Sequence, residues 1–264
     1  MKTAELVTIF EDTQNRVHST DELKKATIEL IDATKVYQED YISKKRVVKN
    51  DVGDLTVVQD TSFSCASKFD GEGKTVTVLN FANPYEPGGG VKRGAKAQEE
   101  CLCRCSNLYN SISNDKVYTD YYGWNKELNG YLFSDRVIYS PGVLVIKDDG
   151  YVLLEEPFRV DVITCAAPYN VYGHDVNVLK ECYVRRIKSI LEVAIGNDVD
   201  ILILGAFGCG AFHNPPSLMA ECFKSVLLDE KYVCFFEKVI FAIPKPSAFD
   251  RNYDVFLQVL GGMI

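Results

Sequence analysis

Two adjacent glutamates, Glu99 and Glu100, closely follow a run of three glycines, Gly88 to Gly90. A carboxyl group can protonate the oxygen of a glycosidic bond and then act as a base, while a neighbouring carboxylate holds a sugar hydroxyl. Glycine backbone opposite the acids leaves room for a sugar, because glycine has no Cβ atom. This combination predicts a site that cleaves a glycosidic bond.

Each of these features also has a purely structural interpretation. A glycine run can be a flexible turn. Acids at the start of a helix complement its dipole, and a helix is expected here because Cys101, Cys105 and Leu108 recur at helical spacing. The closeness of the glycines to Glu99 and Glu100 favours the functional interpretation.

A second glycine-rich loop follows the apolar run 201–204. It contains Gly205, Gly208 and Gly210, and Asn214 then leads towards a helix expected from about Ser217. Successive backbone N–H groups in such a loop can bind a diphosphate without lysine. The spacing fits neither the dinucleotide-binding fingerprint nor the P-loop, so an NAD-linked oxidoreductase is disfavoured.

Strands and helices must bring these two loops together. Short β-branched or apolar runs predict strands over residues 46–50, 75–81, 136–140, 161–168, 201–207 and 238–243. Helical spacing predicts helices over 101–112, 179–195 and 217–228. The alternation predicts a three-layer α/β/α domain whose central sheet is largely parallel, and ligands bind such sheets at the carboxyl ends of the strands.

The N-terminal part of the chain is different. The first 40 or so residues predict two helices, the second opened by a capping box of Ser19 and Glu22. Leu23, Ala26 and Leu30 form an apolar face on that helix, which must pack against another part of the protein. We therefore divide the chain into a helical N-terminal extension, residues 1–44, and a ligand-binding domain, residues 45–264.

The composition limits the possible functions. The chain has 264 residues, 47% of them hydrophobic, and a net charge of −8, which argues against stable binding of nucleic acid through a broad basic surface. No apolar run is long enough to span a membrane, and the N-terminus does not resemble a signal peptide. The nine cysteines do not form a disulfide pattern, so we expect reduced thiols and a cytoplasmic protein.

No metal site is expected. On a helix, Cys103 points away from Cys101 and Cys105, so these three thiols cannot bind one ion. The three histidines of the chain are dispersed and are assigned to the surface or to caps: His18, His174 and His213.

Cys165 and Cys209 lie near strand ends, but no histidine is placed by the sequence to activate either as a nucleophile, so we assign both to the lining of the pocket. The aromatic run around Trp124 could stack on a nucleobase, although core packing is the favoured interpretation.

The loops NFANPYEPGGG and GAFGCGAFHNPP, with Gln-Glu-Glu between them, together resemble the bacterial-type poly(ADP-ribose) glycohydrolases of the macrodomain superfamily. The similarity extends from about Thr75 to the C-terminus and includes LCRCSNLY, VIYSPGVLVIKDD, TCAAPYN and FAIPKPSAFDRNYDVF. The resemblance implies a macrodomain with a mixed, largely parallel sheet. It also implies metal-independent hydrolysis of the ribose–ribose bond of poly(ADP-ribose), with release of ADP-ribose and no cofactor.

The resemblance also implies roles for individual residues. Glu100 matches the catalytic acid, and Glu99 matches the residue that helps to position the ribose. The residues that the resemblance places around the ligand are Asn83, Gly88, Gly89, Gly90, Gln98, Gly208, Cys209, Gly210, Ala211, Phe212 and, against the adenine, Phe249.

Two residues depart from the family pattern: Gly142 stands where an aspartate is common, and His213 stands beside the phosphate loop where a glycine is common. Two alternative functions stay open. One is a non-catalytic reader that binds ADP-ribose, although a reader has no need of Gln98-Glu99-Glu100 beside the glycines. The other is a hydrolase acting on single ADP-ribose groups attached to protein or nucleic acid.

Overall fold

The computed structural model describes residues 1–128, 130–170, 173, 175–245, 247 and 250–261. Its strands are β1 (Lys35–Tyr37), β2 (Leu55–Val58), β3 (Val76–Phe81), β4 (Val137–Lys147), β5 (Leu153–Cys165), β6 (Ile201–Leu204) and β7 (Lys238–Ala242). They form one sheet in the order β1-β4-β5-β3-β6-β7-β2. Neighbours from β5 to β2 are parallel, whereas β4 pairs antiparallel with both β1 and β5. The predicted mixed, largely parallel sheet is confirmed.

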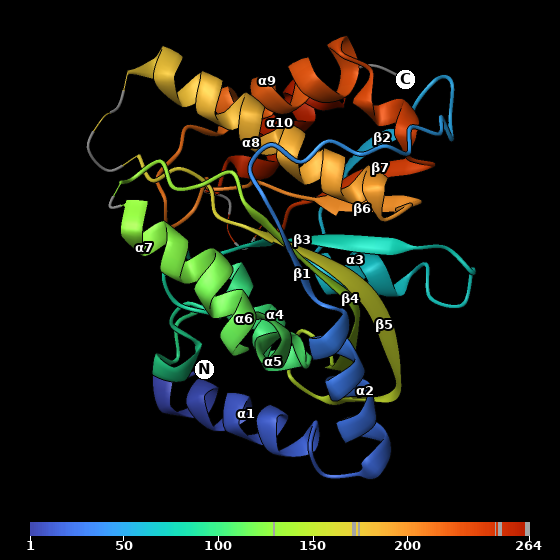
Figure 1. The fold of residues 1–264 in the computed structure, drawn as a ribbon, viewed down its shortest axis with the longest axis vertical. Coiled ribbons are helices and arrows are strands. Elements are labelled where there is room, and N and C mark those ends of the chain that lie inside the picture. Colours follow the sequence, from blue (N-terminus) through green and yellow to red (C-terminus); the bar gives the residue numbers. More distant parts are fainter. Residues whose placement is uncertain (129, 171–172, 174, 246, 248–249, 262–264) are drawn as a thin grey trace.

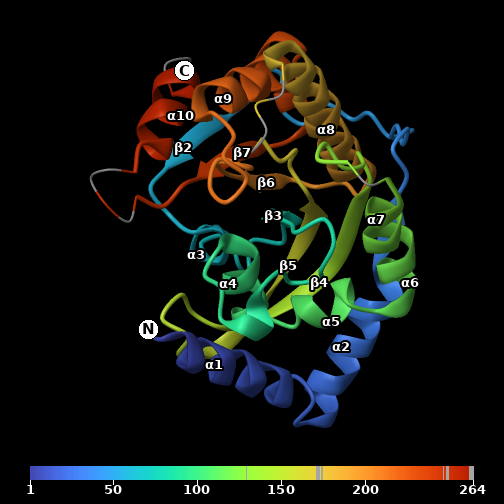
Figure 2. The same ribbon diagram turned by 90° about the vertical axis from the view of Figure 1, so that its left-hand side faces the viewer.

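Helices cover both faces of the sheet, which confirms the predicted three layers (Figures 1 and 2). One face packs on α8 (Val176–Gly196), α9 (Pro216–Lys224) and α10 (Asn252–Leu260). The other face packs on helices that include α3 (Ser62–Ser67), α4 (Gln98–Cys105) and α5 (Leu108–Ile112). The remaining helical segments are α6 (Asp115–Val117), α7 (Trp124–Leu128), η1 (Val91–Arg93), η2 (Tyr118–Gly123), η3 (Ser225–Asp229) and η4 (Tyr232–Phe235).

Two of the expected elements were placed wrongly. Residues 46–50 are not a strand: Val47 and Val48 are exposed, and the N–H groups of Lys49 and Asn50 both bond to the carbonyl of Cys234. The edge strand next to β7 is β2 instead. The helix expected over 101–112 is broken at Ser106, whose backbone is extended and bridges to β4.

The N-terminal segment forms α1 (Thr3–Arg16) and α2 (Asp21–Ala33), the two predicted helices. The cap of α2 is Thr20, whose hydroxyl accepts the N–H of Leu23, rather than the predicted Ser19. β1, which lies inside the expected extension, is an edge strand of the sheet. The sheet therefore begins before residue 45. Both views place α1 and α2 beside α4 and α5 (Figures 1 and 2).

Candidate active site

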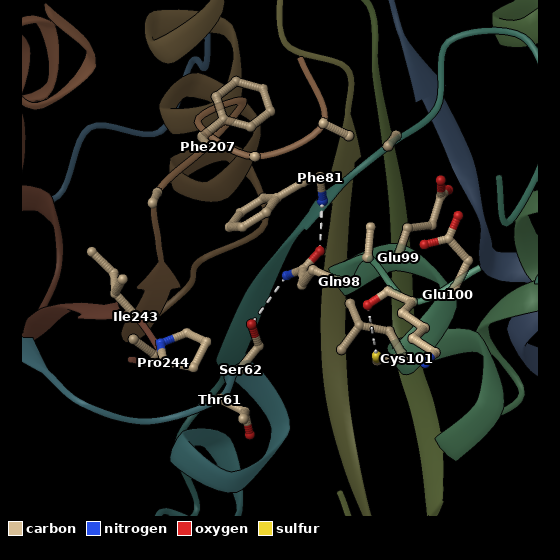
Figure 3. A pocket seen from close by; sticks show the side chains of 18 of the residues that line it. Thr61, Ser62, Phe81, Gln98, Glu99, Glu100, Cys101, Phe207, Ile243 and Pro244 are labelled. Carbon is tan, nitrogen blue, oxygen red and sulfur yellow. Dashed lines mark hydrogen bonds between the residues drawn. The ribbon is translucent and has the colours of Figure 1, made fainter. Parts of the chain in front are cut away.

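A cavity of about 550 Å³ lies where loops leave the carboxyl ends of β3, β6 and β7. The first turn of α4 forms one wall, and the loop after β6 forms another (Figure 3). A cavity of this volume is in the usual range for a small-molecule site. The two glycine-rich loops predicted from the sequence therefore meet at one place, because parallel strands end at the same edge of the sheet.

Glu99 and Glu100 lie side by side in the first turn of α4 (Figure 3). The glycine run holds Glu100 through its backbone: the N–H of Gly90 donates to Oε1 of Glu100 at 2.8 Å. Glu99 accepts the N–H of Asn83 at 2.7 Å and the side-chain amide of Asn80 at 3.4 Å. Backbone and amide donors thus hold both carboxyl groups in fixed positions.

The two acids differ in what remains unbonded. Oε2 of Glu100 is buried and has no hydrogen-bond partner among the described residues, and the side chain lines the cavity. A buried carboxyl oxygen without a partner costs free energy unless a ligand or water bonds to it. Glu100 therefore presents an oxygen for interaction with a bound molecule, whereas the protein itself occupies both oxygens of Glu99.

Burial raises the pKa of Glu99 to about 8, because only 2% of the residue is exposed to water. The neighbouring Glu100 raises it further, and the hydrogen bonds from Asn83 and Asn80 lower it. A carboxyl group with such a pKa carries a proton at neutral pH in the free protein.

The raised pKa predicts how stability depends on pH. Between the ordinary pKa of glutamate, 4.5, and about 8, the unfolded chain has lost this proton and the folded protein keeps it, so stability falls as pH rises. We expect the melting temperature to fall more steeply between about pH 5 and pH 8 in the wild type than in Glu99→Gln. Glu22→Gln, at an exposed position, is the control. Equal slopes in all three proteins would contradict the assignment.

Gln98 lines the cavity, but the protein uses its side-chain amide (Figure 3). Its oxygen accepts the N–H of Phe81 at 2.8 Å, and its nitrogen donates to the carbonyl of Leu79 at 2.7 Å and to the hydroxyl of Ser62 at 3.0 Å. These bonds join the start of α4 to the end of β3 and to α3. The hydrogen bonds of Gln98 therefore fix the position of α4, and its expected contact with a ligand stays a prediction.

Asn83 also lines the cavity. Its side-chain oxygen accepts the N–H groups of Tyr85 and Glu86, which shapes the turn before the glycine run. Gly88, Gly89 and Gly90 lie behind the two acids and do not line the cavity themselves. In this structure the glycines are neighbours of the carboxyl groups rather than part of the cavity wall.

The second loop lines the cavity through Gly208, Gly210, Ala211 and Phe212. Cys209, which the sequence placed in the lining, does not line the cavity, and its thiol donates to the carbonyl of Phe207. Burial raises the pKa of Cys209 to about 12, so this thiol is not a nucleophile at neutral pH.

The profile of the microbial-type PARG catalytic domain matches residues 3–148, more than half of the chain. The chain belongs to this family. A structure of poly(ADP-ribose) glycohydrolase from Thermomonospora curvata superposes with a TM-score of 0.87 at 28% identity and covers 97% of this chain and 100% of that chain. A structure of the same enzyme bound to the inhibitor ADP-HPD gives a TM-score of 0.86 at 29% identity and covers 97% of this chain and 99% of that chain.

Poly(ADP-ribose) glycohydrolase from Deinococcus radiodurans in complex with ADP-ribose gives a TM-score of 0.81 at 29% identity and covers 90% of this chain and 98% of that chain. No protein with a curated description matches the sequence. The two Thermomonospora curvata structures cover nearly the whole of this chain, and the family match begins at residue 3, where α1 begins. The microbial-type PARG fold thus accounts for the arrangement of both loops.

His213, which stands where the resemblance implies a glycine, has a left-handed backbone, with φ of 57°. A side chain in this conformation costs about 1–2 kcal/mol. We therefore expect His213→Gly to increase the free energy of unfolding in urea by about 1 kcal/mol. His213→Ala removes the imidazole and keeps the backbone cost, so it should give no such gain. Equal stability of the two variants would show that the backbone is not the cause.

Gly142, the second departure, lies outside the cavity lining, in β4. Its N–H donates to the carboxylate of Asp161 at 2.7 Å, where the register of β4 and β5 shifts. The position is structural and does not touch the cavity.

The sequence did not reveal several residues of the cavity wall. Thr61 and Ser62, which follow β2, are the cap and the first residue of α3. Ile243 and Pro244 follow β7, and the ring of Phe81 completes the wall (Figure 3). β2 was placed too early in the chain, so its loop was not recognised. Phe249, expected against adenine, lies outside the described residues.

The described residues contain no group of three or more side chains that could hold a metal ion. Cys165 is fully buried and does not line the cavity, contrary to expectation, and burial raises its pKa to about 12. Trp124 donates to Glu39, and Arg136 stacks on its ring at 3.7 Å, so the ring is engaged within the protein.

His18 contacts Asn110, and His174 lies outside the described residues. Among the helices of the described part of the chain, none is long and apolar enough to cross a membrane.

Proposed function

We propose that the protein hydrolyses the ribose–ribose O-glycosidic bond of poly(ADP-ribose) and releases ADP-ribose. The observation that carries the proposal is the unpartnered, buried Oε2 of Glu100 at the wall of the cavity. A buried carboxyl oxygen without a partner costs free energy in the free protein, and a bound sugar is the group that would satisfy it. Membership in the microbial-type PARG family and the likeness to poly(ADP-ribose) glycohydrolase structures support the same activity.

In the proposed reaction, Glu100 donates a proton to the leaving ribose oxygen as the bond from that oxygen to the anomeric carbon breaks. The positive charge that develops on the sugar is stabilised by the carboxylate that Glu100 becomes when it gives up its proton. Water then attacks the anomeric carbon, and its proton returns to Glu100. Glu99 orients the ribose, since its own oxygens are fixed by Asn83 and Asn80.

We propose that the loop after β6 binds the diphosphate. Gly208, Gly210, Ala211 and Phe212 place backbone and one aromatic ring at the cavity, and successive N–H groups can bind phosphate oxygens without a lysine. Asn83 is proposed to contact the distal ribose, and Phe249 the adenine. These assignments leave Glu100 at the ribose end of the ligand.

The activity is tested by incubating the purified protein with poly(ADP-ribose) and, separately, with mono-ADP-ribosylated protein, and measuring released ADP-ribose. We expect release from the polymer. Release only from the modified protein would assign the second substrate class. Calorimetric binding of ADP-ribose without release from either substrate would identify a reader.

We also propose that the protein works in the cytoplasm. All nine cysteines are free thiols in the structure, which is typical of proteins in a reducing compartment. Fractionation of the producing cells, with blotting for the protein, tests this location.

A further inference from the structure

We propose that helices α1 and α2 are positioning elements of the active site, acting on Glu99 and Glu100 through the far end of α4 and through the glycine run. This inference rests on the proposed function, because it concerns the same two acids. It assigns a role to residues that do not line the cavity.

The first contact lies where α4 ends. The last carbonyl groups of a helix have no partner within it and must be satisfied from outside. The hydroxyl of Thr13, in α1, donates to the carbonyl of Arg104 at 2.5 Å, and both residues are fully buried. α4 has only eight residues, so a bond at its end restrains the direction of the whole helix.

The hydroxyl of Thr13 is itself held in place. The ammonium group of Lys147, which is 3% exposed, donates to it at 2.8 Å. Lys147 also bonds to the carbonyl of Ile9 and forms an ion pair with Asp12 at 2.8 Å. α1, α4 and β4 therefore meet at one buried polar junction. Thr13 links α1 and β4 to α4.

α2 makes a second contact, just beyond α4. The buried hydroxyl of Thr27 accepts the side-chain amide of Asn107 at 3.2 Å. The oxygen of the same amide accepts the N–H of Leu144 in β4 at 2.8 Å. The chain leaving α4 is thus held between the N-terminal helices and the sheet.

The third contact reaches the glycine run. The ring of Phe10, in α1, packs edge-on against Tyr109, with centroids 5.1 Å apart. The ring of Tyr109 lies so close to Gly88 that a Cβ atom there would be 2.9 Å from it. The N–H of Gly90, in the same glycine run, donates to Oε1 of Glu100 at 2.8 Å. Phe10 therefore supports the glycine run whose backbone holds Glu100.

These contacts predict that changes in α1 affect turnover and leave the binding of ADP-ribose unaffected. α1 and α2 support the acids, whereas the loops after β6 and β7, which line the rest of the cavity, pack on the other parts of the sheet. Misplacing a catalytic group by about 1 Å can reduce a rate by about a hundredfold. Loss of the Thr13 contact should therefore lower kcat and leave ADP-ribose affinity unchanged.

The test compares Thr13→Val, which keeps the shape and removes the hydroxyl, with Thr13→Ser, which keeps the hydroxyl. We expect kcat on poly(ADP-ribose) to fall between about tenfold and a hundredfold in the valine variant, and to return towards the wild-type value in the serine variant. Rates are expressed per ADP-ribose-binding site, measured by calorimetry, so that unfolded protein does not enter the comparison. Wild-type kcat in Thr13→Val would overturn the proposal.

Hydrogen exchange read by mass spectrometry gives a measurement that needs no activity. In Thr13→Val, amides of residues 98–108 should exchange faster, while those of 201–214 stay unchanged. If the wild type binds ADP-ribose and releases none, the proposed function fails and the exchange data still test the role of α1. Unchanged exchange in 98–108 would overturn the positioning role even if the wild type is active.

Discussion

Replacement of Glu100 by glutamine is expected to reduce the release of ADP-ribose from poly(ADP-ribose) by between about a hundredfold and ten-thousandfold, the usual contribution of a general acid–base. Glutamine keeps the size of the side chain and can still accept the N–H of Gly90, but it cannot donate and recover a proton as a carboxyl group does. ADP-ribose affinity, measured by calorimetry, should be retained, because the loops after β6 and β7 are unchanged.

Glu99→Gln is the matched control for this experiment. The oxygens of Glu99 already accept hydrogen bonds from the protein, so removing this carboxyl group should reduce turnover less than removing that of Glu100. A larger loss in Glu99→Gln than in Glu100→Gln would reverse the two assignments. Equal and full activity in both variants would remove the acids from the mechanism.

Replacement of Gly89 by alanine should have the second largest effect. A Cβ atom at this position would lie 2.5 Å from Oε1 of Glu100 and 3.1 Å from Oε2 of Glu99, and φ is 54°. The methyl group must therefore push both carboxyl groups from their positions. We expect kcat to fall by about a hundredfold and the free energy of unfolding to fall by about 1–2 kcal/mol from the backbone conformation alone.

Gly73→Ala separates the effect of the left-handed backbone from the effect of displacing the carboxyl groups. Gly73 also has a positive φ, 69°, but a Cβ atom there would meet nothing within 4 Å. This variant should lose stability by a similar amount in urea unfolding and keep its kcat. If Gly89→Ala keeps its kcat as well, the glycine run does not constrain the acids.

Several features of this protein were determined by local sequence. The strands β3, β6 and β7 are short apolar runs covered on both faces, and this pattern can be read without knowing their partners. The glycine-rich loops after β3 and β6 follow from composition, and parallel strands must end at the same edge. For these reasons the meeting of Glu100 with the second loop could be predicted.

Only the tertiary structure decided which groups hold the two acids and which carboxyl oxygen is left without a hydrogen-bond partner. Ser106 continues a helical pattern in the sequence, yet it is extended because β4 offers it a bridge. Oε2 of Glu100 has no partner among the described residues, whereas each oxygen of Glu99 accepts a hydrogen bond, although the sequence presents two equal neighbours. The bond from Thr13 to Arg104 joins residues 91 positions apart. Burial and hydrogen bonding between distant segments depend on packing, which no local pattern encodes.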